Sequence, residues 1–171
     1  MPLHVKFTPN TIDYIQASRL LAIKTPLFVL LAVVTVIIIA GSLIGLFFQL
    51  FTYSTWNNVA LVSLLVGGFY IFYYFAMVPA QLTKTINKNE ALKKERTFTF
   101  GESEVDLAIG DKVSPLPWEH FTHVLKGRTM YIMVCEEGKK TYPFLPNRAF
   151  ADQGSEKAFL AILEQHSIPV K

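Results

Sequence analysis

The sequence is poor in charged residues and almost free of cysteine. Only 17% of its 171 residues are Asp, Glu, Lys or Arg, whereas a soluble domain usually carries about 25%. No charged residue lies between Thr25 and Thr83. This gap excludes a wholly soluble protein, a disordered chain and a large multidomain enzyme. The single cysteine, Cys135, excludes an internal disulfide bond and suits a reducing compartment.

The charge-free segment is long enough for two transmembrane helices. A helix rises about 1.5 Å per residue, so roughly 20 apolar residues cross a hydrocarbon core about 30 Å thick. We predict a helical hairpin over residues 26–79, with spans at about 27–51 and 59–78 and an outer loop at 52–58. Pro79 is expected to close or kink the second span.

Basic residues flank the predicted hairpin and are missing from its loop. They are Lys6, Arg19 and Lys24 before the first span, and Lys84, Lys88, Lys93, Lys94 and Arg96 after the second. The positive-inside rule therefore predicts that both termini are cytoplasmic. Residues 80–96 are predicted to be a basic juxtamembrane connector, whose attraction to anionic lipid is worth at most about 1 kcal/mol per cation.

Small residues are spaced four apart in both predicted spans. Gly41 and Gly45 lie in the first span, and Ser63 and Gly67 lie in the second. Small residues let helix backbones approach each other in lipid, so these four are the candidate helix–helix packing residues. Contact within the hairpin is the simpler interpretation, and a homodimer face is the alternative. Neither span holds an ionisable side chain of the kind that ion or proton transport usually needs.

Residues 1–25 are predicted to form a cytoplasmic strand and a short amphipathic helix. Leu3, Val5 and Phe7 alternate with polar residues, as is typical of a half-buried strand. The residues after Pro9 show helical spacing and lead into the first span. The strand has no partner nearby in the sequence and could add to a sheet in the C-terminal domain.

Residues 97–171 have the pattern of a small α+β domain. Short alternating runs separated by turns predict five or six antiparallel strands. A helix beginning at Ser155 would follow them, with one face formed by Ala158, Phe159, Ile162, Leu163 and His166. The predicted fold class is therefore a membrane α-helical hairpin plus a small cytoplasmic domain, an antiparallel split barrel capped by a C-terminal helix.

Four segments of the sequence resemble YcxB-like membrane proteins. They are FTPNTIDYIQASRLLA, KKERTFTFGESEVDLAIG, PLPWEHFTHVLKGRTMYIMV and YPFLPNRAF. The resemblance covers nearly the whole chain and implies a protein of the bacterial cytoplasmic (inner) membrane. It also implies that residues 97–171 form a YcxB-like domain of the pleckstrin-homology (PH) type. It brings no catalytic residue to carry over.

The sequence lacks the usual catalytic and metal-binding motifs. It has no P-loop, GxSxG, HExxH or paired CxxC. His120 and His123 are three apart, and on a strand they would point to opposite faces. We therefore predict no enzymatic activity, no cofactor and no metal site. From Thr97 onward the net charge is about −2, so nucleic acid is not an expected partner.

One basic trio is a candidate contact for an anionic partner. Lys139, Lys140 and Arg148 flank the last predicted strand and could bind an anionic headgroup or an acidic protein. The predicted function is a membrane-tethered interaction module without chemistry of its own. Besides the lipid bilayer, its partner would be a membrane or cytoplasmic protein, a lipid, or a second copy of the chain. The alternative is a component of a membrane-embedded enzyme or transport complex.

Overall fold

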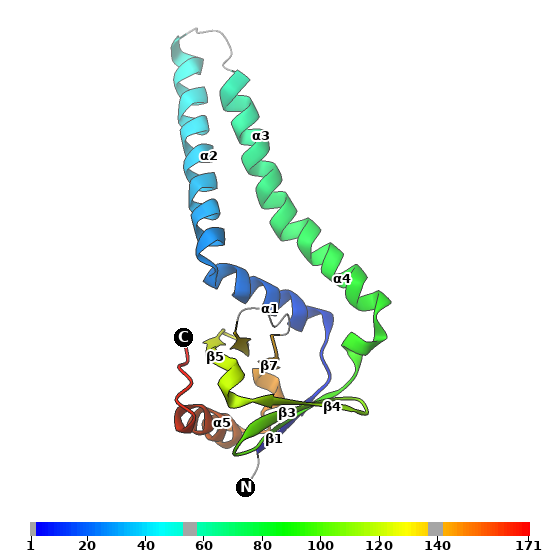
Figure 1. Ribbon diagram of the computed structural model, residues 1–171. Helices are drawn as coiled ribbons and strands as arrows, with labels where there is room; N and C mark the ends of the chain where they lie inside the picture. The colour runs from blue at the N-terminus through cyan, green and yellow to red at the C-terminus, as the bar shows by residue number, and fades with distance from the viewer. Residues whose placement is uncertain (1–2, 53–57, 137–141) are drawn as a thin grey trace. The chain divides into compact units, whose positions relative to one another are not determined.

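The computed structural model describes residues 3–52, 58–136 and 142–171 (Figure 1). The chain divides into two compact units. The helical unit is Leu21–Thr85, and the sheet unit combines Met1–Leu20 with Ile86–Lys171. The sheet unit thus takes its residues from both sides of the helical unit in the sequence.

The helical unit contains the two apolar helices that the sequence predicts. Helix α2 spans Pro26–Thr52, and helix α3 spans Asn58–Phe72. Two helical segments, Pro26–Phe48 and Ala60–Lys88, are long and apolar enough to cross a membrane. The prediction of two such helices is confirmed, while most of the predicted outer loop lies outside the described residues.

Pro79 does not end the second helix. The chain continues from α3 through a π-helical turn, η1 (Tyr73–Met77), into α4 (Val78–Lys88). The Val78 N–H donates to the carbonyl of Tyr73, five residues earlier. A proline lacks the N–H that would bond four residues back, and its ring crowds that carbonyl. The wider π-helical turn directly before Pro79 accommodates this defect without breaking the helix.

Helices α2 and α3 contact each other through only part of the predicted set of small residues. A Cβ added at Gly67 would lie 2.6 Å from Cγ1 of Ile39, so α2 approaches α3 closely there. Ser63 is half-buried. At Gly41 and Gly45 an added Cβ would meet nothing within 4 Å. Close approach of α2 to α3 is therefore seen at Gly67, whereas Gly41 and Gly45 have open space beside them and their role in helix packing remains a prediction.

Two antiparallel sheets form the sheet unit. The first has the order β1-β2-β3-β4 and the second β5-β6-β7. The strands are β1 (Leu3–Phe7), β2 (Arg96–Phe100), β3 (Glu104–Ile109), β4 (Lys112–Pro117), β5 (Phe121–Lys126), β6 (Met130–Cys135) and β7 (Phe144–Pro146). Helices α1 (Thr11–Lys24) and α5 (Gln153–Gln165) and three short turns, η2 (Glu90–Lys93), η3 (Trp118–His120) and η4 (Asn147–Ala149), complete the described elements.

The sheets are not closed into a barrel, which corrects the predicted split barrel. Among the described residues, no strand of one sheet is hydrogen-bonded to a strand of the other. Turn η3 separates β4 from β5. Pro115 and Pro117 lie on β4, and each lacks the N–H that a further strand would need from it. The remaining prediction, a small α+β domain with a C-terminal helix, is confirmed.

The N-terminal strand joins the sheet that follows the helical hairpin in the sequence. Strand β1 pairs antiparallel with β2, so that Val5 lies opposite Phe98. Val5 and Phe7 are buried, and the ring of Phe7 stacks on that of Phe98 with centroids 6.2 Å apart. The expectation that this strand adds to the C-terminal domain is confirmed.

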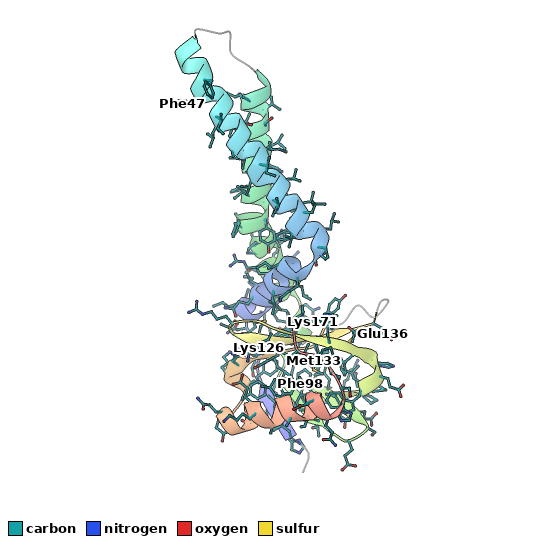
Figure 2. All side chains as sticks on the ribbon, turned by 90° about the vertical axis from the view of Figure 1, so that its left-hand side faces the viewer. Phe47, Phe98, Lys126, Met133, Glu136 and Lys171 are labelled. Carbon is teal, nitrogen blue, oxygen red and sulfur yellow. The ribbon has the colours of Figure 1, made fainter. Side chains whose placement is uncertain are left out.

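The core of the sheet unit is rich in aromatic side chains. Phe98 on β2 and Met133 on β6 are fully buried and lie among the packed side chains of this unit (Figure 2). Phe159 and Leu163 contribute the buried face of α5. This helix begins two residues before the expected Ser155, because Asp152 caps it and exchanges hydrogen bonds with Ser155.

Candidate functional site

The candidate site begins with an arginine in a core-facing position. On β2, residues Arg96, Phe98 and Phe100 share the buried face of the strand. The two phenylalanines enter the core, whereas Arg96 brings a cation to the beginning of the same strand. Arg96 is only 8% exposed. Arginine is rarely buried to this extent unless it is paired with an anion.

Cross-strand register brings further polar side chains to the same face. Arg96 lies opposite Ile109 on β3, and Ile109 lies opposite Lys112 on β4. Cross-strand partners share one face of a sheet, and Ser114 follows Lys112 on that face because successive side chains alternate. At this end of the sheet, β4 therefore contributes exposed polar side chains to the face that carries Arg96.

These residues line a cavity of about 430 Å³, which we call the Arg96 cavity. Its lining comes from η2 and the residue after it, the start of β2, the end of β3, the β3–β4 turn and β4: Ala91, Leu92, Lys94, Arg96, Ile109, Asp111, Lys112 and Ser114. The lining holds three cationic side chains and one carboxylate. Its volume falls within the range of roughly 300–1,000 Å³ that is typical of small-molecule sites.

Arg96 is held by aromatic and hydroxyl groups. Its Nη2 donates a hydrogen bond to the hydroxyl of Tyr14, which in turn donates to the carbonyl of Leu92 over 2.7 Å. The guanidinium carbon lies 5.4 Å from the ring centroid of Tyr14 and 5.2 Å from that of Phe144. These contacts orient the guanidinium and provide cation–π attraction.

The contacts of Arg96 leave its positive charge without a counterion. In the described part of the chain, no carboxylate lies within 4.0 Å of its guanidinium, and its buried Nε has no hydrogen-bond partner. The adjacent acid, Glu95, pairs instead with Lys6 over 2.9 Å. Removing a charge from water without pairing it costs free energy. The burial of Arg96 is therefore expected to lower the stability of the folded protein.

Burial shifts the titration of both partners in the Arg96–Tyr14 pair. Desolvation lowers the pKa of the Arg96 guanidinium, and the charge and hydrogen bond of Tyr14 partly oppose this shift. Desolvation also raises the pKa of the Tyr14 phenol, against the influence of Arg96. Tyr14 therefore keeps its proton at neutral pH, and Arg96 remains a cation because a guanidinium in a protein is effectively always protonated.

A glycine in the β3–β4 turn allows Lys94 to approach the cavity. Gly110 has φ = 58°, a left-handed conformation that suits glycine, and its N–H donates to the carbonyl of Glu95 over 3.3 Å. A Cβ at Gly110 would lie 3.2 Å from Cδ and 3.6 Å from Nζ of Lys94. The absence of a side chain thus gives the lysine room beside the turn.

Arg148, the described member of the predicted basic trio, has a different environment. Lys139 and Lys140 lie outside the described residues. Arg148 forms an ion pair with Asp13, whose side chain is 6% exposed. Asp13 also exchanges hydrogen bonds of 2.8 Å with Asn10 and so closes the N-terminal cap of α1. The charge of Arg148 is therefore engaged in joining α1 to η4.

Within the described residues, no group of three or more His, Cys, Asp and Glu side chains could hold a metal ion. His120 lies in η3 and His123 on β5, where the hydroxyl of Thr122 lies 3.0 Å from its Nδ1. Cys135 is buried. The absence of enzymatic activity, cofactor and metal remains a prediction.

From the charge pattern alone, Arg96 belongs only to the basic connector. The alternation RTFTF places Arg96 on the same face as two phenylalanines, and this signal could have identified it as a buried cation. Tyr14 and Phe144 could not be found in the same way, because they come from distant parts of the chain.

Comparisons with protein-family models, with curated proteins and with solved structures found no match to this chain.

Proposed function

We propose that this chain is a membrane-tethered binding module that acts without chemistry of its own. The observation that carries this proposal is the Arg96 cavity, in which a buried cation lacks a counterion. A fold that retains such a costly group at the edge of its core suits ligand binding better than simple structural support. The bound partner would be a lipid or a protein.

The helical unit supports the membrane part of the proposal. Large apolar side chains on α2 and α3 are widely exposed, among them Leu30, Ile37 and Val66 at 59–64%. A hydrocarbon environment removes the cost of exposing such surface to water. Neither apolar span carries an ionisable side chain, which favours a tether over a transport pathway.

The pairing of β1 with β2 supports a hairpin topology. Strand β1 precedes both apolar helices in the sequence, and β2 follows them. Because the two strands are hydrogen-bonded, both flanks would lie on one side of any membrane that the helices cross. Together with the distribution of lysine and arginine, this favours cytoplasmic termini. We retain the YcxB-like, PH-type and bacterial inner-membrane assignments as parts of the proposal.

Co-purification with matched cavity variants tests this function. The full-length chain would be purified in mild detergent, and mass spectrometry would identify the proteins and lipids that accompany it. Ser114→Phe places a bulky group on the cavity face of β4. Val113→Phe makes a similar change on the opposite face of the same strand, where Val113 is 61% exposed.

The expected result is one enriched lipid or one stoichiometric protein that Ser114→Phe loses and Val113→Phe retains. Equal retention by both variants would exclude the Arg96 cavity as the binding site. A preparation free of any enriched partner, from membranes of the native host, would overturn the binding-module proposal.

A further inference from the structure

We infer that the Arg96 cavity binds a phosphate group, carried either by an anionic lipid headgroup or by a soluble phosphorylated molecule. This inference rests on the proposed binding function and names the chemistry of its ligand. It depends on the charge, donors and dimensions of the cavity.

The charge of the cavity lining is the first argument. Lys94, Arg96 and Lys112 face a single carboxylate, that of Asp111. From Thr97 onward the chain carries a net charge of about −2, so the cavity lining, with three cations against one carboxylate, is more positive than the strands and helix that follow β2. A local excess of positive charge suits one phosphate group, whereas a polyanion such as nucleic acid needs an extended basic surface.

The hydrogen-bond donors are the second argument. Arg96 lines the cavity, and its Nε–H has no acceptor among the described residues. A guanidinium presents a planar fork of donors that matches the oxygens of phosphate, and lysine adds a compact point charge. The hydroxyl of Ser114 is a further donor in the lining. An anion here would offset the cost of burying Arg96 without a partner.

The dimensions of the cavity are the third argument. Its volume of about 430 Å³ exceeds the space that a phosphate ion alone would fill, and leaves room for an attached organic group. Leu92 and Ile109 provide apolar lining beside the cations. The cavity also follows α4 within a few residues of the chain, since η2 begins at Glu90 and α4 ends at Lys88.

The experiment measures lipid and phosphate binding by the full-length protein. Native mass spectrometry would be run on protein in mixed micelles that contain equal amounts of phosphatidylglycerol and phosphatidylcholine. Inorganic phosphate would be titrated separately, with hydrogen exchange followed over residues 91–96 and 109–114. Lys94→Gln and Lys112→Gln each remove one cation from the cavity. Lys157→Gln, on the exposed side of α5, removes the same charge elsewhere.

We expect each cavity variant to weaken binding about three- to tenfold, because each removes one charge-assisted contact, and Lys157→Gln to leave it unchanged. Preferential retention of phosphatidylglycerol identifies a lipid headgroup. Protection by inorganic phosphate without lipid preference identifies a soluble phosphorylated ligand. Absence of both effects, or an equal loss in Lys157→Gln, would overturn the inference. The binding-module proposal has its own test. If phosphate and lipid have no effect but a co-purifying protein is lost from Ser114→Phe, the cavity binds a protein and only the phosphate inference is overturned.

Discussion

Arg96 shows how one residue can depart from the pattern that builds the fold around it. Its position on β2 calls for an apolar side chain like those of Phe98 and Phe100, with which it shares the buried face. The fold tolerates the cation through the rings of Tyr14 and Phe144 and one hydroxyl, without a carboxylate in the described residues. Residues of this kind commonly exchange stability for binding.

Arg96→Met separates these two roles of the side chain. Methionine keeps an unbranched apolar stem and removes the unpaired charge, so the unfolding temperature in detergent should stay the same or rise. Phosphate-dependent protection should be lost. Arg96→Ala also removes the stem and should destabilise the protein by about 1–2 kcal/mol. Strong destabilisation by Arg96→Met would show that the charge itself supports the fold.

The environment of Tyr131 predicts that the folded protein loses stability at alkaline pH. Burial and the hydrogen bond that its hydroxyl donates to Glu156 raise the pKa of the Tyr131 phenol. The folded protein therefore favours the protonated phenol, and this stabilisation is complete below the pKa of an unfolded tyrosine, about 10. It is lost as the pH rises from there through the higher pKa of the folded state.

Thermal unfolding between pH 8 and pH 11 measures this contribution, in the window set by the tyrosine pKa. Tyr131→Phe should reduce the alkaline decline in unfolding temperature. Tyr142→Phe, which changes an exposed tyrosine, should leave the decline unaltered. The interpretation fails when both variants follow the same pH profile as the original protein.

Gly67 determines how closely helices α2 and α3 approach each other. A side chain at Gly67 would overlap Ile39, whereas one at the adjacent Gly68 would meet nothing within 4 Å. Gly67→Leu should therefore separate α2 from α3 and reduce their association by about 1–3 kcal/mol. Gly68→Leu should have little effect. The measurement is the resistance of each purified variant to thermal unfolding in detergent.

Gly41→Leu provides a control on the other helix and addresses the homodimer alternative. Its position is open to solvent or lipid in the described structure, so the hairpin should remain as stable as before. A loss of stability equal to that of Gly67→Leu would contradict the contact that we describe. Chemical crosslinking of the purified protein in detergent would test the alternative. If Gly41→Leu kept its stability and lost a crosslinked dimer that the original protein forms, Gly41 would belong to a homodimer face.

Local patterns predicted most helices and strands, whereas features that depend on pairing between distant segments were not predicted. The alternation of apolar and polar residues predicted β1, and Val5 and Phe7 are buried in the structure as that alternation requires. The barrel prediction failed because closure depends on pairing between strands of different sheets, which no local pattern encodes. The π-helical turn before Pro79 was missed for a related reason. A proline signals a defect in the helix, and it does not specify how the neighbouring turns absorb that defect.

The sheet unit is built from residues that lie before and after the helical hairpin in the sequence. Residues 97–171, which the sequence presents as the domain, lack β1, α1 and Arg96. Val5 and Phe7 are 2% and 6% exposed, and burying each contributes about 1.5–3 kcal/mol. A domain is typically stable by only about 5–15 kcal/mol in total. The compact unit thus extends beyond residues 97–171, and we expect its stability to depend on the N-terminal residues that the sequence-based boundary leaves out.

Two fragments test this division of the chain. Residues 97–171 alone should not fold, because the edge of β2 and the core beneath Val5 and Phe7 would be open to water. Residues 1–20 joined by a flexible glycine–serine linker to residues 86–171 restore the complete sheet unit and should give a cooperative thermal transition by circular dichroism.

In the joined fragment, Val5→Asp should abolish that transition, since a buried unpaired carboxylate is strongly destabilising. His4→Asp, on the exposed face of the same strand, should preserve it. Cooperative unfolding of residues 97–171 alone would show instead that β1 is an accessory strand and that the sequence-based boundary was sufficient.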